Sequence, residues 1–234
     1  MKRIVTEYSF RAGQIDRPLR LAVVSDLHSG PFDDLLETFG RCDAVLVPGD
    51  LVDRHRQDNS RALRFLEAVP EIVPVFYAVG NHERKYKYKA DYLRKVSESK
   101  VLLLDNRSVD FHGVRIGGLS STWDRKPDLA FLDAFEKAEG WRLLMCHHPE
   151  MYRDYVAGRQ IDLTLCGHAH GGQMQFFGRG IYAPGQGLFP KLTHGIHDGG
   201  RMIVSRGMTN NVRLPVPRIN NPCELIILNL ERTE

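Results

Sequence analysis

The sequence predicts an α/β fold, a four-layer α/β/β/α sandwich in which two mixed sheets pack face to face and helices cover their outer faces. In the first half of the chain, apolar runs alternate with helical patterns, as in βαβ units whose strands are buried on both faces. The second half is richer in short strands, which indicates a mixed sheet. A chain of 234 residues can bury the core of such a fold, and we expect a single domain over residues 1–234.

In the first half, each predicted strand is a short apolar run that ends in glycine or a polar residue. These strands are 19–25, 43–48 and 73–79. The segments between and after them carry helical patterns. These helices are 33–41, 61–69 and 90–99. Asn59 or Ser60 is the expected N-cap of the second helix, since both residue types accept a hydrogen bond from the first turn.

In the second half, residues 107–111 and 114–119 flank a Phe-His-Gly turn and are predicted to form a hairpin. The other strands are again apolar runs: 101–104, 141–146, 162–166, 202–205 and 224–230. Helices are predicted at 128–139 and 151–157. The segment 173–197 is long, rich in glycine and poor in strand signals, and long loops inside compact domains are often functional.

The composition is that of an ordinary globular protein, with 42% hydrophobic and 26% charged residues. The formal charge of +3 is too small to indicate nucleic acid, and no extended basic stripe predicts a duplex partner. The four cysteines are far apart without a CxxC spacing, so we expect buried thiols in a reducing compartment. No segment is long and apolar enough for an export signal or a membrane span, which predicts a cytoplasmic protein. The sequence does not indicate an oligomeric state.

Five polar motifs follow predicted strands, and they are the strongest functional signal. In chain order they are Asp26-Leu-His28, Gly49-Asp50-Leu-Val-Asp53, Gly80-Asn81-His82-Glu83, His147-His148-Pro149 and Gly167-His168-Ala-His170-Gly-Gly. Ligands of open α/β sheets gather at the carboxyl ends of strands, where all five motifs are expected. Together the motifs supply the Asp, Asn and His side chains that two neighbouring metal ions need.

The spacing within the motifs suits metal binding. On an extended backbone, Asp26 and His28 point the same way and can converge on one ion, and His168 and His170 repeat that geometry. The Asp50 carboxylate has two oxygens and can bridge two cations, while Asn81 offers a neutral oxygen. Oxygen and imidazole ligands without thiolate favour Mn, Fe or Zn.

Each motif alone has a simpler explanation. An Asp-x-His pair is common, Gly-Asn-His-Glu could be a turn with an exposed histidine, and His147-His148 could be a core histidine beside a loop histidine. The ordered set of five motifs, each after a strand, makes coincidence the weaker explanation.

The set resembles the calcineurin-like metallophosphoesterase superfamily, from about Arg20 to the C-terminus. Within it, the chain is most similar to the bacterial branch typified by the YkuE and YaeI phosphodiesterases. Two stretches carry that finer match: Gly167-His-Ala-His-Gly-Gly-Gln173, and Val204-Ser-Arg-Gly207 followed by Pro217-Arg-Ile-Asn-Asn-Pro222. The resemblance implies the metallophosphatase fold and a metal-dependent phosphoesterase.

The resemblance also implies residue roles. The first metal would be held by Asp26, His28 and His170. Asp50 would bridge, and Asn81, His147 and His168 would hold the second metal. His147 is chosen over His148 because the family pattern is His-x-Pro. His82 would be the catalytic histidine outside the ligand set, with Asp53 and Glu83 as its support.

The chain departs from the family pattern in three places. Ala169 stands where threonine is more usual, with a side chain expected to face away, and Glu83 stands where aspartate is more common. Relatives of this branch often begin with a membrane anchor or export signal, whereas this chain begins almost at the first sheet. That last difference argues against a lipid or cell-wall substrate.

The predicted function is dinuclear metal-dependent phosphohydrolysis of a small anionic phosphoester, a diester rather than a monoester. Two divalent ions, Mn most readily, would share a hydroxide that attacks phosphorus, and His82 would assist the leaving oxygen. One alternative is a sugar-nucleotide pyrophosphatase acting on lipid precursors, which needs an apolar patch that the sequence does not show. The other alternative is a non-catalytic metal-binding scaffold.

Substrate contacts are harder to locate from the sequence. Basic and aromatic residues at 84–89 and basic residues at 54–56 predict a cationic wall at the metal rim, or else solvated loops. His194, His197 and Arg206 could face the substrate. For Phe176 and Phe177 we favour a packed loop whose aromatic rings cover a sheet edge.

Overall fold

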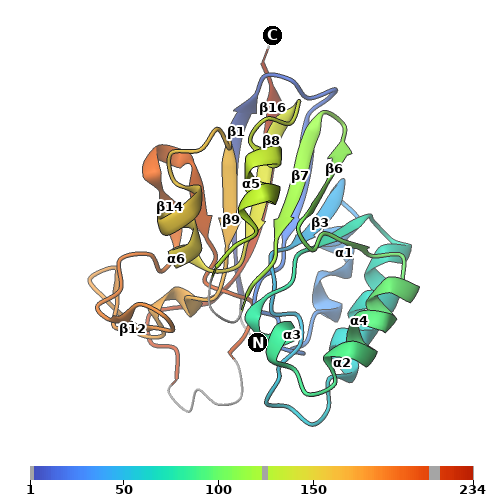
Figure 1. Ribbon diagram of the computed structural model, residues 1–234. Helices are drawn as coiled ribbons and strands as arrows, with labels where there is room; N and C mark the ends of the chain where they lie inside the picture. The colour runs from blue at the N-terminus through green and yellow to red at the C-terminus, as the bar shows by residue number, and fades with distance from the viewer. Residues whose placement is uncertain (1–2, 123–125, 211–216, 234) are drawn as a thin grey trace.

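The structure, a computed structural model, describes residues 3–122, 126–210 and 217–233. Two six-stranded sheets form its centre (Figure 1). The first sheet has the order β1 (Arg3–Ala12), β16 (Cys223–Arg232), β2 (Leu19–Val23), β3 (Ala44–Val47), β4 (Val75–Tyr77) and β5 (Leu102–Leu103). Strands β2 to β5 are parallel, and β16 is antiparallel to β2. This sheet is therefore mixed.

The second sheet is mixed as well. Its order is β14 (Gly195–His197), β15 (Met202–Val204), β9 (Leu163–Cys166), β8 (Trp141–Cys146), β7 (Val114–Leu119) and β6 (Arg107–Phe111). Strands β7, β8, β9 and β15 are parallel, and the edge strands β6 and β14 run antiparallel to their neighbours. The predicted hairpin at 107–119 is confirmed.

Helices cover the outer faces of the two sheets. The first sheet carries α1 (Leu36–Phe39), α2 (Ser60–Ala68) and α4 (Lys89–Glu98), whose buried side chains include Phe39, Phe65 and Tyr92. The second sheet carries α5 (Leu129–Phe135) and α6 (Pro149–Met151), which continues as a π-helical turn at Tyr152–Val156. Short 3-10 turns lie at Asp33–Leu35, Val69–Glu71, His170–Gly172 and Asp198–Gly200.

Alternation along the strands produces three separate hydrophobic layers. In β2, Ala22 packs toward the helices of the first sheet, whereas Leu21 and Val23 join the layer between the sheets. In β8, Leu143 faces that same inner layer and Leu144 faces α5 and α6. Because side chains of a strand alternate between faces, three apolar layers require four layers of secondary structure. The predicted four-layer sandwich is confirmed.

Two elements were not predicted, and one local prediction was wrong. Strand β1 was not expected, yet it pairs with β16 along its whole length. A short helix, α3 (Asn81–Lys85), begins within the third motif. The segment 173–197 is not poor in strands, since it contains the hairpins β10 (Gln175–Phe176) with β11 (Arg179–Gly180) and β12 (Tyr182–Ala183) with β13 (Gly187–Leu188), followed by β14.

The other predicted helices and strands are present with bounds shifted by a few residues; the largest change is the helix expected at 128–139, which ends at Phe135. Asn59 is the N-cap of α2, although its side chain bonds other loops instead of the helix. Among the described residues, no helix has the length and apolar character needed to cross a bilayer.

Candidate metal centre

The five motifs meet where the carboxyl ends of strands from both sheets come together. Asp26 and His28 follow β2, Asp50 follows β3, Asn81 and His82 open α3 after β4, and the remaining histidines follow β8 and β9. Three groups of buried side chains in this region could each hold a metal ion. They are Asp26, His28 and His170; His28, Asp50 and His82; and Asp50, His147 and His168.

The backbone that aims these side chains is not extended. Asp26 and His28 have φ values of 53° and 47°, and His168 and His170 have φ values of 67° and 47°. The premise that an extended Asp-x-His backbone brings its two side chains together was therefore wrong, although the side chains do converge. Non-glycine residues at positive φ are strained and cluster at functional sites. Asp50 adds a further example with φ of 57°.

The first group is closely packed. The Nε2 atoms of His28 and His170 are 3.3 Å apart, and they lie 3.8 Å and 3.6 Å from Asp26 Oδ1. Asp26 is held in place by the Ser25 hydroxyl, which donates to Oδ2 at 2.5 Å, and by the His168 amide at 3.1 Å. All three side chains are buried, so this arrangement is fixed by the fold.

Asp50 links the two sides of the centre. Its Oδ2 lies 3.1 Å from His147 Nε2 and 4.0 Å from His28 Nε2, and so faces both the second and the first group. The backbone amide of His82 donates to Oδ1 at 2.8 Å. The carboxylate is thus placed between two sets of imidazoles, as a bridging ligand would be.

Within the part of the chain that the structure describes, Asn81 Oδ1 and His168 Nε2 are buried atoms with no hydrogen-bond partner. A buried polar atom without a partner costs about 1–3 kcal/mol, so such atoms are rare. Both atoms belong to residues that the sequence predicts as metal ligands. The oxygen and imidazole donors, without any thiolate, fit divalent ions such as Mn, Fe or Zn.

His82 lies at the edge of this centre. Its Nε2 is 3.9 Å from Asp50 Oδ2, and its Nδ1 is 3.4 Å from Asp53 Oδ1 and accepts from the Arg54 amide at 3.1 Å. His82 is thus close enough to Asp50 and His28 to count among the possible ligands by distance. Its contacts with Asp53 and Arg54 fix the ring with Nε2 toward the centre.

Glu83 organises the loop that carries Asp50. Oε2 accepts from the amides of Gly80 and Asp50 at 2.8 Å and 3.0 Å. Oε1 accepts from the amides of Leu51 and Val52 at 2.7 Å and 3.2 Å. A completely buried carboxylate with four backbone donors joins the end of β3 to the start of α3, which positions both Asp50 and His82.

Comparison with known proteins identifies the family of this centre. The family model of the calcineurin-like phosphoesterases matches residues 19–172, which contain all five motifs. The chain belongs to the calcineurin-like phosphoesterase family. It is 30% identical to an uncharacterized metallophosphoesterase of Campylobacter jejuni over 93% of this chain, and 27% identical to one of Helicobacter pylori over 69%.

The YaeI-like branch is confirmed too, since Phosphodiesterase YaeI of Escherichia coli is 26% identical over 68% of this chain and 63% of its own length. The chain spans 60% of the Campylobacter protein and 47% of the Helicobacter protein.

Burial lowers the pKa of three histidines in this centre. It lowers the pKa of His28 and His170 to about 3, assisted by the positive charge of His82 at His28 and of Arg218 at His170. Burial also lowers the pKa of His168 well below its usual value. Neutral imidazole is the form that binds metal. Burial opposes protonation of His147 as well, but the adjacent Asp50 carboxylate outweighs it and raises the pKa to about 10.

His148 lies outside the three groups of described residues. Its ring packs against His168 with centroids 4.3 Å apart, and its Nδ1 is 3.1 Å from the Ser121 hydroxyl. His147 thus belongs to one of the three groups, whereas His148 belongs to none of them.

His194 and Arg206, which the sequence analysis places near the substrate, form hydrogen bonds with residues beside the metal centre. His194 Nδ1 contacts Gln175 at 3.0 Å, and Arg206 donates to Asn221 at 3.2 Å. Gln175 and Asn221 in turn donate to the carbonyls of Gly171 and His170 at 2.8 Å and 2.7 Å. His194 and Arg206 thus belong to a polar network that supports the His170 turn.

Two interpretations of the rim need correction. Arg84 is not a free cation of a substrate wall, because it bonds Asp105 at 2.5 Å and the Ser121 carbonyl at 3.1 Å. Phe177 does not cover a sheet edge, because its side chain is 106% exposed, and Phe176 is 48% exposed.

Sequence reasoning missed Arg218. Its guanidinium lies 3.2 Å from His170 Nδ1 and donates to the Thr209 carbonyl at 2.8 Å. The same carbonyl is 3.2 Å from His170 Nδ1 and is the acceptor for that ring. Arg218 stands in the Pro217–Pro222 stretch that carried the branch resemblance, so a signal was present without an assigned role.

Proposed function

We propose that this protein is a dinuclear metal-dependent phosphohydrolase that prefers phosphodiesters. The observation that carries the proposal is the position of Asp50, whose Oδ2 faces His147 on one side and His28 on the other. Asp26, His28 and His170 would hold one divalent ion, and Asn81, His147 and His168 the other, with Asp50 shared. Mn²⁺ fits this mixture of oxygen and imidazole donors.

When bound, the two cations would lower the pKa of a water molecule toward neutrality and offset the charge of the phosphoryl oxygens. His82 then has a distinct task. In the neutral ring, Nδ1 accepts from the Arg54 amide, and the proton is therefore on Nε2, which faces the centre. Burial opposes the charged form, but Asp50 and Asp53 together raise the pKa of His82. The raised pKa favours the doubly protonated ring, whose Nδ1–H faces Asp53 Oδ1 at 3.4 Å and whose Nε2–H can be donated to a leaving oxygen, which returns the ring to its neutral form.

Hydrolysis of bis-p-nitrophenyl phosphate and p-nitrophenyl phosphate with added Mn²⁺ tests this proposal. We expect the diester to be hydrolysed faster. The His82→Ala variant should lose turnover by about 10²-fold or more while its metal content stays near that of the wild type. The control is His112→Asn, in the turn between β6 and β7 and outside the three groups, which should keep full activity.

Two other results would change the proposal. Metal loss in His82→Ala would make His82 a ligand. Metal binding without hydrolysis of either ester would favour a non-catalytic scaffold, against which the complete set of donor residues argues.

A further inference from the structure

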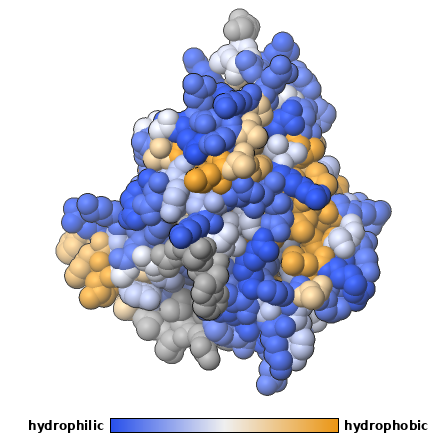
Figure 2. Space-filling model, viewed as in Figure 1, coloured by the Kyte–Doolittle hydropathy of each residue, from blue (hydrophilic) through white to orange (hydrophobic). Residues whose placement is uncertain are grey.

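The two hairpins that follow the His170 turn expose an unusual amount of apolar surface. Among the described residues, six of the thirteen exposed large hydrophobic side chains come from the segment 176–196. Phe177 is 106% exposed, Phe189 73% and Leu188 70%; the others are Phe176, Tyr182 and Ile196. Figure 2 shows hydrophobic residues gathered at the lower left of the molecule, where Figure 1 places β12. We name Phe177, Leu188 and Phe189 the hairpin tips.

The backbone at the tips shows that folding does not favour these aromatic residues. Phe177 and Gly178 form the two-residue loop between β10 and β11, with φ values of 50° and 76°. Two central residues at positive φ define a type I′ turn, in which the first position favours asparagine, aspartate or glycine. Phe177 is strained there and is fully exposed. Phe189, with φ of 51°, repeats the combination.

The charge of this region has one sign. Residues 163–197 contain no aspartate or glutamate, and their lysine and arginine residues are Arg179 and Lys191. Both are exposed. Phe189 and Lys191 line a hollow of about 480 Å³ together with the Gly178–Gly180 segment, so the two hairpins form one continuous surface.

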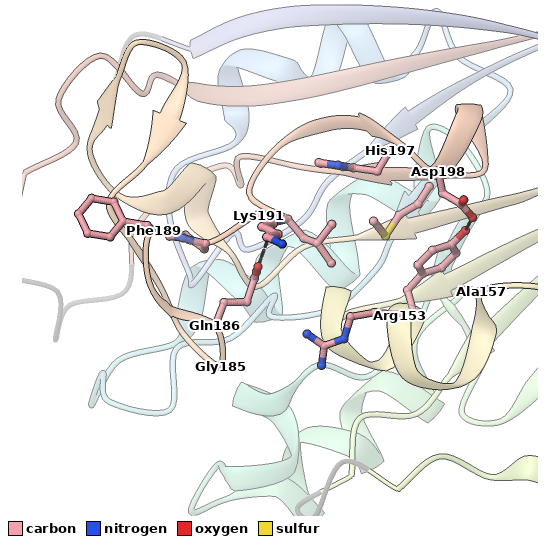
Figure 3. Close-up of a pocket in the computed structure, with 12 residues that line it drawn as sticks. Arg153, Ala157, Gly185, Gln186, Phe189, Lys191, His197 and Asp198 are labelled. Atoms are coloured by element: carbon pink, nitrogen blue, oxygen red, sulfur yellow. Dashed lines mark hydrogen bonds between the residues drawn. The ribbon is translucent and has the colours of Figure 1, made fainter.

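A second hollow of about 650 Å³ lies between the β12–β13 hairpin and the π-helical turn, with Arg153 and Lys191 in its lining. Figure 3 shows the Phe189 ring projecting away from the other labelled residues of this hollow. Arg153 donates to its neighbour Asp154 at 2.7 Å, and Asp198 accepts from the Tyr152 hydroxyl. Lys191 therefore supplies the positive charge next to the exposed ring.

We propose that the hairpin tips dock this protein on an anionic lipid surface. The hairpins combine exposed aromatic and aliphatic side chains with lysine and arginine and have no acidic residue of their own, and the nearby Asp154 and Asp198 are bonded to Arg153 and Tyr152. This combination binds at the interface of a negatively charged bilayer. The hairpins also rise directly from the metal centre, because the Ile181 amide donates to the Gly172 carbonyl at 3.1 Å. Docking would bring the His170 side of the centre to the lipid surface.

This surface also supplies the apolar patch that the sequence did not show. Docking is nevertheless separable from catalysis, because the tips lie outside the three groups of possible metal ligands. A failure to bind lipid would therefore leave the proposed hydrolysis untouched.

Co-sedimentation with vesicles tests the proposal. The probes are vesicles of phosphatidylglycerol and phosphatidylcholine in equal parts and vesicles of phosphatidylcholine alone. We expect the full chain to bind the anionic vesicles more tightly and to be released by salt, since screening weakens the attraction. The double variant Phe177→Asn/Phe189→Asn should bind the anionic vesicles with an affinity at least about tenfold lower than that of the wild type. Because asparagine suits positive φ, this variant should fold at least as well as the wild type.

Matched controls separate the tips from general effects. Ile72→Asn/Leu129→Asn removes two exposed apolar side chains elsewhere and should bind like the wild type. Arg179→Glu/Lys191→Glu should lose anionic binding, whereas Arg107→Glu/Lys137→Glu, with the same change in net charge, should keep most of it. Hydrolysis of soluble bis-p-nitrophenyl phosphate reports that each variant is intact.

The proposal is overturned if the wild type ignores anionic vesicles at low salt, or if the tip variant binds them equally well. It is also overturned if the wild type sediments as a dimer that the tip variant converts to a monomer. That result would assign the surface to a second copy of the chain.

Discussion

Replacement of Glu83 by glutamine tests how the fold holds the metal centre. The carboxylate accepts four backbone N–H bonds, two at each oxygen, from Gly80, Asp50, Leu51 and Val52. Glutamine keeps one oxygen, so two of the amides would face its NH₂ group. Two lost bonds to a charged acceptor cost about 3–6 kcal/mol.

Part of that cost is offset. Burial and the nearby Asp50 charge raise the pKa of Glu83, which shows that the negative charge is itself unfavourable there. Glutamine removes the charge, and we expect a net destabilisation of about 2–4 kcal/mol for Glu83→Gln.

The assay is urea unfolding of the metal-free protein, followed by circular dichroism in EDTA at pH 7. The control is Glu98→Gln, which breaks an exposed pair with Arg94 and should leave the unfolding midpoint unchanged. A free energy of unfolding within about 0.5 kcal/mol of the wild type for Glu83→Gln would refute the organising role of this carboxylate.

Two further predictions concern the histidines. In EDTA, stability should fall as the pH drops from about 6.5 toward 3, because the folded pKa values of His28 and His170 are lowered to about 3 and the unfolded chain binds protons first. The folded pKa of His147 is raised to about 10, so its contribution to stability is present below pH 6.5 and is lost as the pH rises from 6.5 to 10. Urea midpoints across pH should show a shallower acid slope in His28→Gln, and an unchanged slope would contradict the assignment. Arg218→Gln should weaken metal affinity by about 10–100-fold in a chelator competition, since the Thr209 carbonyl that orients His170 loses its donor. Arg142→Gln, which loses a bond to Asp162 in the second sheet, is the control and should keep wild-type affinity.

The strands of both sheets could be predicted because they are short apolar runs bounded by polar turns. Strand β1 was not predicted because it is an edge strand, in which the half-buried side chains Thr6, Tyr8 and Phe10 alternate with exposed ones. The alternation is visible in the sequence, but the strand that pairs with β1 is β16, which lies at the other end of the chain. Helix α3 is only five residues long and polar, and Glu83 holds it in place rather than an apolar face.

The residues that form the candidate centre were predicted from their order along the chain, while their local conformation was not. Asp26, His28 and Asp50 have positive φ values, and the loops that carry them are joined by backbone bonds from Asp26 to Gly49 and from His28 to Asp50, so spacing in the sequence does not reveal the strain. Arg218 reaches His170 across 48 residues. The hairpin of β10 and β11 was not predicted, because phenylalanine occupies the turn position at which asparagine is the usual sequence signal.

The metal content of the purified chain tests the account most directly. Elemental analysis of the wild type loaded with Mn²⁺ should find two ions per chain, and Asp50→Asn should lose both, because its carboxylate lies between the two groups of imidazoles. One ion per chain in the wild type, or loss of a single ion in Asp50→Asn, would contradict a shared carboxylate and with it the dinuclear centre.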